Sequence, residues 1–396
     1  MKSTRDDALV IALVALGHGT SHFFQLILAP LFPLIKDELG VSYAALGFVV
    51  ALFYALSAFF QPVAGFVVDR FGGRAVLVGG MTCLTLGTLA VGSASTYPML
   101  VAGAALAGFG NSVFHPADFS ILNARVGSSR LGYAYSAHGI SGALGYAAAP
   151  LFSGTFGALL GWHSALFAAS GVGIFMVVLL LANWTRFHVD TAASRRPEGS
   201  TGLRVLLVAP VVMCFLYFTI YACGLSGVQS FSVTAFTVQY GVLPAFASSA
   251  LTAYMIGSAA GIFTGGFIAT RTARHDLVAA SGLFLGACSV FCIALGAIPA
   301  SAVPVFLGLA GYCIGATGPS RDLIVRSSTP PGATGRVYGF VYSGFDVGGF
   351  LMPVFYGWLM DHSLPQGVFY LSAGFTLLAM GTVLQLPGRR PAIQRT

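Results

Sequence analysis

Charged side chains are scarce in this chain of 396 residues, because only 8% are Asp, Glu, Lys or Arg while 56% are hydrophobic. A soluble domain carries roughly 25% charged residues, and a soluble fold with so few would expose apolar surface and aggregate. Glycine is abundant instead, with 51 residues, as in transmembrane helices whose backbones pack closely. The composition therefore predicts an integral membrane protein and excludes a soluble one.

Motifs of nucleotide and metal chemistry are also missing from the chain. No glycine-rich loop ending in Lys-Ser or Lys-Thr is present, so ATP is not expected to drive the protein. There is no His-Glu-x-x-His pair and no carboxylate–histidine cluster with metal spacing. The six cysteines lie in apolar segments without such spacing, which favours a packing role. We therefore expect a protein that is not an enzyme, with no cofactor and no metal.

Apolar segments long enough to cross a bilayer, which takes about 20 residues, recur along the whole chain. They predict an all-α integral membrane protein with twelve transmembrane helices. The expected helices cover residues 8–31, 44–68, 75–93, 98–122, 131–155, 162–185, 204–228, 244–269, 276–297, 302–325, 334–358 and 366–386. The first of them is expected to be retained, because no small-residue cleavage site follows it.

The cationic side chains predict how the chain is oriented. Arginines fall in every second loop, beginning with Arg70 and Arg74, and only Lys36 and Arg321 lie outside this series. Because Lys and Arg accumulate on the cytoplasmic side of a membrane, both termini are expected in the cytoplasm. The net charge of +7 then reflects topology and contact with anionic lipid, and we expect no nucleic-acid partner.

An internal repeat divides the chain into two similar parts. Pro116 pairs with Pro319, and Pro150 with Pro353, at a common offset of 203 residues (319 − 116) that several glycines and aromatic residues share. Parallel repeats of this kind occur in transporters. We predict an N-terminal six-helix bundle at 1–185, a cytoplasmic linker at 186–203, and a C-terminal six-helix bundle with a short tail at 204–396.

A charged turn between the second and third expected helices carries a recognisable signature. Gly65, Asp69, Arg70, Gly72 and Arg74 resemble the motif that major facilitator transporters carry at this place. The resemblance implies the major facilitator fold, with two pseudo-symmetric six-helix bundles. It also implies a gating role for the turn, in which the acid contacts the C-terminal half on the cytoplasmic side and the two arginines brace the loop.

Within that superfamily the chain most resembles the fosmidomycin-resistance efflux proteins. The likeness rests on Ser21-His22, on Gln61-Pro62 and on the stretch from Gly110 to Pro116. The chain departs from that subfamily in two places. Gln25 and Leu26 stand where an acid usually follows the histidine of the first-span motif closely, and Ala117 precedes Asp118 where an acid usually follows Phe-His-Pro.

Two expected helices carry stripes of polar side chains. The first has His18, His22 and Gln25, and the fourth has Asn111, His115 and Asp118, both with spacings of four and three residues. At 3.6 residues per turn, each set lies on one face of its helix. We interpret the stripes as walls of one aqueous cavity. The alternative is a hydrogen-bond network that only packs the N-terminal half.

An ionisable group in the middle of a membrane usually serves a function, and the C-terminal half has one carboxylate there, Asp346. A carboxylate at that depth suits proton coupling, although it could instead bond to backbone at the glycine-rich segment around it. The set expected to couple protons is Asp346, His115, His22 and Asp118. The set expected to contact substrate is His18, Gln25, Asn111, His138 and Arg321.

Arg321 is the repeat partner of Asp118. We predict that the two pair in an inner gate when the cytoplasmic side closes, which adds them to the gating residues of the signature turn. The competing prediction is that Arg321 captures an anionic group of the substrate. Neighbouring helix residues point about 100° apart, so Arg321 and Asp322 are not expected to neutralise each other.

These observations predict a secondary active transporter that exports a small organic molecule, drug-like or anionic, by proton antiport through alternating access. A proton-coupled importer of a small organic anion is the alternative, and a membrane receptor or intramembrane metal enzyme is a remote one. The expected partners are a small-molecule substrate, protons and the lipid bilayer. The expected setting is a bacterial inner membrane, with the protein as a multi-pass monomer.

Overall fold

The computed structural model describes residues 4–127, 130–188, 206–329 and 334–385, and within them the side chains of Thr4, Asp69, Thr334 and Arg336, together with Gly132 and Gly335, are outside the description. The described residues form helices joined by short turns. The helices are α1 (Thr4–Leu26), α2 (Phe32–Leu39), α3 (Tyr43–Phe71), α4 (Gly73–Gly92), α5 (Tyr97–Asn111), α6 (Phe114–Arg125), α7 (Leu131–Ala182), α8 (Ala209–Tyr240), α9 (Pro244–Arg271), α10 (His275–Ala294), α11 (Val303–Ser327), α12 (Thr334–Leu351), α13 (Pro353–Asp361) and α14 (Pro365–Gln385), with 3-10 turns η1 (Ala29–Leu31), η3 (Trp184–Phe187) and η6 (Ala300–Ala302).

The number of membrane crossings agrees with the sequence. Ten stretches of the described chain are long and apolar enough to span a membrane. One of them contains most of α7, which bends at Gly161, where φ is 82°, and therefore supplies two crossings. Helices α12 and α13 are separated only by Met352, and together they supply one more. The prediction of an all-α protein with twelve transmembrane helices is confirmed for the described residues.

Several helix ends differ from the sequence prediction, and two of these differences have a clear cause. Helix α1 ends at Leu26 rather than at residue 31, because Pro30 and Pro33 follow in η1 and at the start of α2. Helix α8 runs on to Tyr240, where the prediction ended at 228. Ser, Thr and Gln residues lower the hydropathy of its last turns, but most of these turns are buried. Gly241, with φ 65°, then ends the helix.

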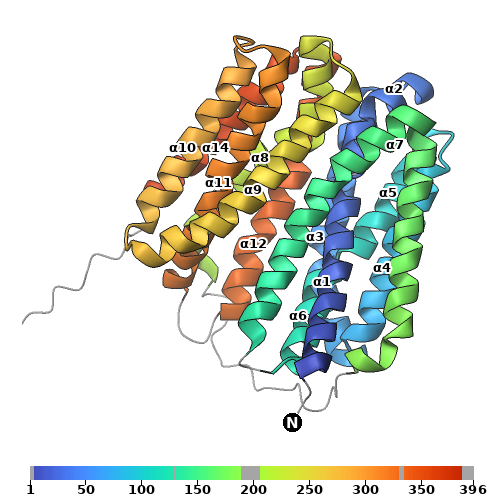
Figure 1. The fold of residues 1–396 in the computed structure, drawn as a ribbon, viewed down its shortest axis with the longest axis vertical. Coiled ribbons are helices and arrows are strands. Elements are labelled where there is room, and N and C mark those ends of the chain that lie inside the picture. The colour runs from blue at the N-terminus through green and yellow to red at the C-terminus, as the bar shows by residue number, and fades with distance from the viewer. Residues whose placement is uncertain (1–3, 128–129, 189–205, 330–333, 386–396) are drawn as a thin grey trace, which may run out of the picture.

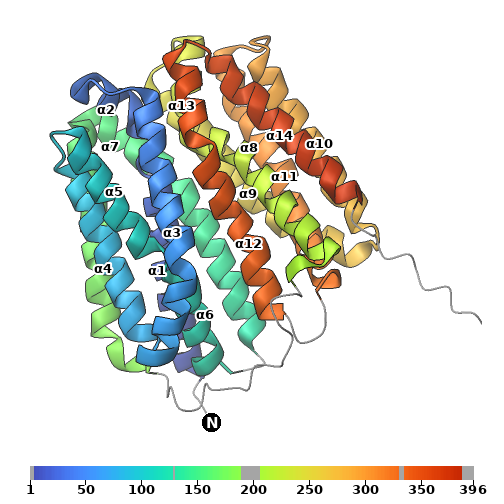
Figure 2. The ribbon, with the colours of Figure 1, turned by 180° about the vertical axis from the view of Figure 1, so that it is seen from behind.

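The helices form two groups, seen from opposite sides in Figure 1 and Figure 2. Helices α1–α7 make one group and α8–α14 the other, and α3 and the part of α7 before Gly161 lie along the border between them. We call the end at which the N-terminus lies the N-side and the opposite end, where α2 lies, the α2-side (Figure 1). The domain boundaries stay a prediction, because residues 189–203 of the expected linker lie outside the described chain.

The two groups pack closely at the α2-side. A Cβ atom added to Gly47 of α3 would lie within 3.0 Å of the backbone of Pro353 and Val354, and one added to Gly357 of α13 would meet the backbone of Tyr43 as closely. The Asp361 carboxylate accepts hydrogen bonds from the N–H groups of Tyr43 (2.7 Å) and Ala44 (2.9 Å). A side chain of the second group thus caps the first turn of α3.

Glycines on the N-side half of the border have different surroundings. Gly65 of α3, Gly139 of α7 and Gly339 of α12 have open space where a Cβ atom would lie. Gly65 follows Gly47 by 18 residues, which is five helical turns, so both point from the same face of α3. The face of α3 that contacts α13 at the α2-side therefore has no close neighbour at the Cβ position of Gly65.

Candidate functional site

Five polar side chains from three helices meet inside the first group of helices. His18 and His22 come from α1, His115 and Asp118 from α6, and His138 from α7. Asp118 Oδ2 lies 3.1 Å from Nε2 of His138 and 3.4 Å from Nδ1 of His18. The His18 ring stacks on His138 with centroids 3.5 Å apart. We call these five residues the histidine cluster.

The open side of the histidine cluster is at His115. Asp118 and His18 are buried, with 0% and 3% of their surface exposed, and His138 is buried as well. His22 is half-buried and His115 is exposed. The two sequence stripes therefore meet, but as a packed group with one accessible member rather than as facing walls.

Local sequence explains why the imidazoles can gather there. A Cβ atom on Gly142 of α7 would lie 3.0 Å from His18 Nε2 and 3.1 Å from the His22 ring, so a glycine leaves the room that the rings occupy. Between α5 and α6 the helix is interrupted at Ser112 and Val113, just before Pro116. This interruption fits the missing N–H group of proline.

An amide network lies next to the histidine cluster. The Gln25 amide donates to Asn111 Oδ1 (3.1 Å), and the Asn111 amide donates to Ser57 Oγ (2.9 Å). The Tyr146 hydroxyl donates to Gln25 Oε1 (2.6 Å), and its ring lies 4.3 Å from that of His22. Gln25 and Asn111 thus bond to each other and join helices α1, α3, α5 and α7.

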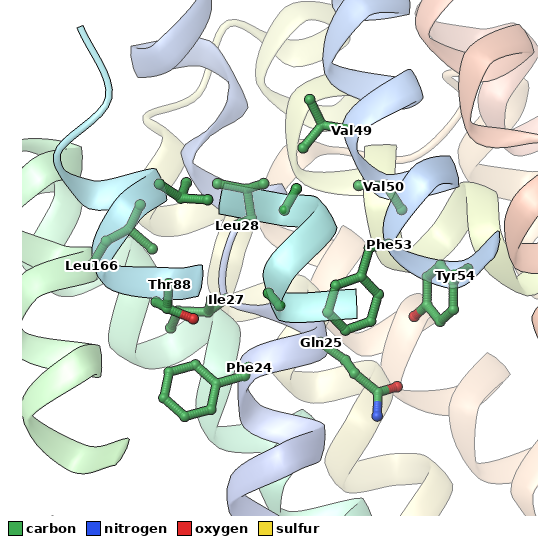
Figure 3. A pocket seen from close by; sticks show the side chains of 13 residues that line it. Phe24, Gln25, Ile27, Leu28, Val49, Val50, Phe53, Tyr54, Thr88 and Leu166 are labelled. Carbon is green, nitrogen blue, oxygen red and sulfur yellow. The ribbon is translucent and has the colours of Figure 1, made fainter. Parts of the chain in front are cut away.

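A small cavity borders this network. It has a volume of about 40 Å³ and is lined by Gln25, Phe53 and Tyr54 together with apolar side chains of α1, α3, α4, α5 and α7 (Figure 3). Ordered water needs roughly 10–15 Å³ of such volume. The cavity can therefore hold water beside Gln25 but is too small for an organic substrate.

Asp346 of α12 faces the first group of helices across the border. It lies close enough to Tyr54 and Tyr146 for electrostatic interaction with both, and Tyr54 interacts in turn with Tyr146. Close packing supports this position, because a Cβ atom on Gly349 would lie 3.0 Å from the Tyr54 ring. Among the described side chains, no Lys, Arg or His forms an ion pair with Asp346.

Arg321 of α11 lies in an aromatic setting within the second group. Its guanidinium is 4.9 Å from the centroid of Phe218 and 5.7 Å from that of Phe345. Arg321 Nε donates to Asp322 Oδ1 at 3.0 Å, and the Tyr342 hydroxyl donates to the same oxygen at 2.8 Å.

The prediction that neighbouring Arg321 and Asp322 do not neutralise each other is therefore wrong. The Cβ atoms of the two residues do point in different directions, but the Arg321 side chain is long enough for its Nε to turn back along the helix to Asp322. Arg321 is not paired with Asp118, which keeps its histidine partners in this structure. The predicted gate between them remains a prediction for another conformation.

The signature turn joins α3 to α4 at the N-side. Gly72 has φ 83° and ψ 147°, a conformation that requires glycine. The Arg74 guanidinium lies 4.8 Å from the ring of Trp184 in η3, and that of Arg70 lies 5.5 Å from Phe71. Cation–π contacts thus hold both arginines. The role predicted for Asp69 lies outside the described residues.

Comparison with known proteins decides the family. The family model described as Major Facilitator Superfamily matches residues 14–243 and again 228–395. The chain belongs to the Major Facilitator Superfamily. It is therefore a multi-pass membrane transporter rather than an enzyme, as the sequence predicted.

The individual proteins that resemble this facilitator share only low sequence identity with it. The fosmidomycin resistance protein of Escherichia coli (strain K12) is 24% identical over 391 residues, covering 96% of this chain and 93% of that one. A probable nitrate/nitrite transporter of Mycobacterium tuberculosis is 27% identical and covers 92% of each chain. A crystal structure of a bacterial homologue of the human lysosomal transporter Spinster, inward-facing and occupied, shares the fold with TM-score 0.82, 15% identity and 97% coverage of each chain.

Sequence reasoning missed three residues of this site and its surroundings. Tyr146 and Ser57 complete the amide network, and Asp361 bonds across the border at the α2-side. Tyr146 follows Gly142 by one helical turn, so the glycine that makes room for the histidines could have pointed to it. Asp361 ends α13, beyond the expected helix at 334–358, and its position alone did not reveal its partner.

Proposed function

We propose that this facilitator exports a small organic molecule in exchange for protons by alternating access. In this proposal Asp346 carries the proton, and His22, His115 and Asp118 take part in coupling. His18, Gln25, Asn111, His138 and Arg321 contact or position the substrate. The signature turn acts in gating at the N-side.

The observation that carries the proposal is the place of Asp346. It is a carboxylate at the border between the two groups of helices, opposite Tyr54 and Tyr146, without an ion-pair partner among the described residues. With no cation paired to it among the described residues, the negative charge of this carboxylate is removed only when it takes up a proton. Movement of the two groups changes its surroundings and therefore its hold on that proton.

A continuous series of polar contacts supports a link between Asp346 and the histidine cluster. Tyr146 interacts with Tyr54 and bonds to Gln25, and its ring packs on His22. His22 lies 4.3 Å from His18, ring to ring, and His18 contacts Asp118. In this proposal, a change of charge at Asp346 or Asp118 acts on the other residue through these contacts, which join the two groups of helices.

The direction of transport is proposed from the name of one relative. The Escherichia coli relative is a fosmidomycin resistance protein, and removal of a toxic compound from the cell is one route to resistance. We take fosmidomycin as the first probe for this chain, because that relative spans nearly the whole of it.

The test uses proteoliposomes with an imposed pH gradient and fosmidomycin outside. Antiport predicts accumulation in vesicles with an acidic lumen, because protons leave as the probe enters. Empty vesicles and vesicles carrying Asp346→Asn are the controls. If accumulation needs an acidic exterior, or is independent of the gradient, the proposed antiport is wrong.

Import of a small anion with protons is a second candidate. It is favoured by the similarity to a probable nitrate/nitrite transporter and by Arg321, a guanidinium within the second group of helices. Asp322 already pairs with this guanidinium, so an anion would have to displace a carboxylate. Nitrate accumulation that requires an acidic exterior and is lost in Arg321→Gln would support this candidate over export.

Alternating access makes a prediction for Gly65. If the N-side closes in the other state as the α2-side does here, the free face of α3 at Gly65 must pack against the second group. Gly65→Val is expected to fill the space that now lies open and to reduce transport at least about tenfold, by hindering that closure. Fosmidomycin binding to the open state is expected to persist.

The measurement is the distance between spin labels on the N-side ends of α3 and α12, with and without fosmidomycin. Wild type is expected to show a short-distance population that Gly65→Val lacks. Gly374→Val is the matched control, because Gly374 of α14 also has open space for a Cβ atom but lies away from the border. Full transport by Gly65→Val would show that this face does not close.

A further inference from the structure

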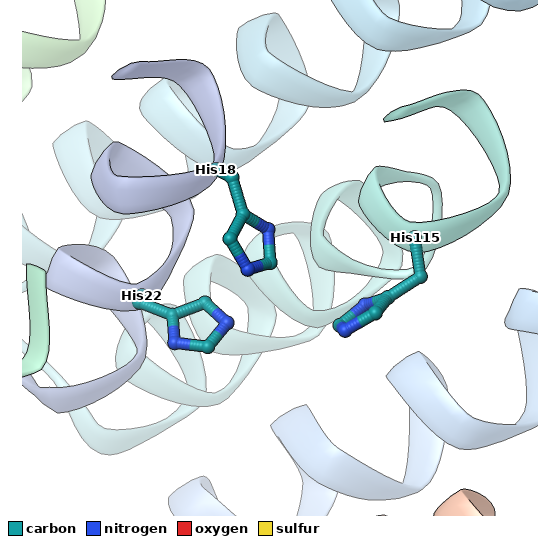
Figure 4. Close-up of side chains that lie close together, drawn as sticks. All are labelled: His18, His22 and His115. Carbon is teal, nitrogen blue, oxygen red and sulfur yellow. The ribbon is translucent and has the colours of Figure 1, made fainter. Parts of the chain in front are cut away.

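We propose that His18, His22 and His115 form a binding site for a divalent transition-metal ion of the zinc class. The three imidazoles come from α1 and α6 and turn toward a common point (Figure 4). The site goes beyond the proposed transport function, because it assigns a second ligand to the histidine cluster.

The distances fit a metal ion after a small adjustment. One nitrogen from each imidazole lies within 4.8 Å of the others. Nitrogens bound tetrahedrally to zinc at about 2.0–2.1 Å are roughly 3.4 Å apart. The three nitrogen atoms must therefore move closer together, and rotation of one histidine side chain is enough to achieve this. His115 is the exposed member and is the one free to make it.

Unpartnered atoms in the cluster support a cation. The Nδ1 atoms of His18 and His22 and Oδ1 of Asp118 are buried and lack hydrogen-bond partners. His18 and Asp118 are both more than nine-tenths buried. A buried acceptor without a donor is costly; a metal ion bound to His22 Nδ1 would satisfy that atom directly, and its charge would offset that of the buried Asp118 carboxylate.

Asp118 and His138 fit the role of outer partners. Asp118 Oδ2 lies 3.4 Å from His18 Nδ1, and His138 bonds to the same oxygen. A carboxylate behind a metal-binding histidine fixes the ring and offsets the charge of the metal. His18 would then bind the ion through Nε2, with Nδ1 turned to Asp118.

The three imidazole ligands determine which class of metal ion the site would bind. Imidazole suits zinc, nickel, cobalt and copper, whereas calcium and magnesium prefer oxygen ligands. Three histidines leave a position for water or another small ligand in a tetrahedral site. Exposure of His115 gives the ion access. Because a bound ion requires neutral imidazoles, metal and protons compete for these residues.

The experiment uses the full-length protein in detergent, with its affinity tag removed and its metals stripped by chelator. Cobalt(II) is the spectroscopic probe, and zinc is titrated against a chromophoric chelator. We expect a stoichiometric site with the intense visible absorption of tetrahedral cobalt. His22→Ala and His115→Ala are each expected to weaken zinc binding at least about tenfold.

The matched control is His163→Ala. His163 bonds to Glu38 and to the carbonyl of Gly92, away from the cluster, and its loss should leave the affinity for zinc unchanged. Gel filtration and helical circular dichroism verify that each variant is folded. Absence of stoichiometric binding, or binding that survives both His22→Ala and His115→Ala, overturns the site. If Asp118→Asn and His138→Ala lose zinc binding while His22→Ala and His115→Ala keep it, this ligand set is wrong.

The two proposals can fail separately. Gradient-driven transport by chelator-treated protein would leave the proposed function intact whether or not zinc binds. Zinc binding by protein that shows no gradient-driven transport would support the metal site while contradicting proton antiport.

Discussion

An Asp346→Asn variant is expected to lose gradient-driven transport by roughly 100-fold or more, the size of effect typical when a proton-transfer group is removed. Asparagine keeps the shape of the side chain opposite Tyr54 and Tyr146 but cannot take up and release the proton. Exchange of labelled for unlabelled fosmidomycin without a gradient should persist, because exchange requires no net proton movement. Parallel measurement of driven uptake and exchange in proteoliposomes separates the two.

The matched control for this prediction is Asp276→Asn. Asp276 is a carboxylate at the N-side start of α10 that pairs with the exposed Arg274, far from the border between the groups. Its loss should leave both driven uptake and exchange within about twofold of wild type, as is usual for surface substitutions. Equal driven uptake in Asp346→Asn and wild type would exclude Asp346 as the proton carrier.

The Asp361→Asn variant is expected to shift the molecule away from the state described here. Asp361 accepts hydrogen bonds from Tyr43 and Ala44 and so ties α13 to the first turn of α3. Asparagine keeps one acceptor oxygen but turns an NH2 group toward the second N–H, so one hydrogen bond to a charged acceptor, worth about 1.5–3 kcal/mol, is lost. A difference of one or two kcal/mol changes a two-state equilibrium roughly 5–30-fold. The ratio of molecules with a closed α2-side to molecules with an open one should fall by that factor.

Spin labels on the α2-side ends of α3 and α13 measure this shift directly. Asp37→Asn is the control, because Asp37 of α2 is an exposed carboxylate at the same end of the molecule. The control should keep the wild-type distance distribution, and Asp361→Asn should gain a longer component. Identical distributions for Asp361→Asn and wild type would mean that packing at Gly47 and Gly357 alone holds this end closed.

The fold followed from the sequence because membrane physics leaves few choices. Each crossing must satisfy its own backbone hydrogen bonds, so apolar segments of sufficient length become helices. The offset between Pro150 and Pro353, with the signature turn at Gly72, then pointed to a duplicated bundle. The end of α8 was predicted too early, since Ser230, Ser232 and Thr234 are polar by type yet buried in the structure.

The side-chain partners of the site depended on packing between helices that are distant in sequence. Helical spacing placed His18 and His22 on one face, and His115 and Asp118 on another. It could not show that His138 of α7 would bond to Asp118. Sequence offset paired Asp118 with Arg321, whereas in the structure each has a closer partner on its own side of the border.

The proposed exchange of substrate for protons at Asp346 is tested most directly by proton release on substrate binding. Purified protein in weak buffer with a pH indicator is titrated with fosmidomycin while binding is followed in parallel. Antiport predicts that protons appear in solution in proportion to the probe bound, and that Asp346→Asn binds the probe without releasing them. Proton uptake on binding, or release that is the same in Asp346→Asn as in wild type, would contradict it.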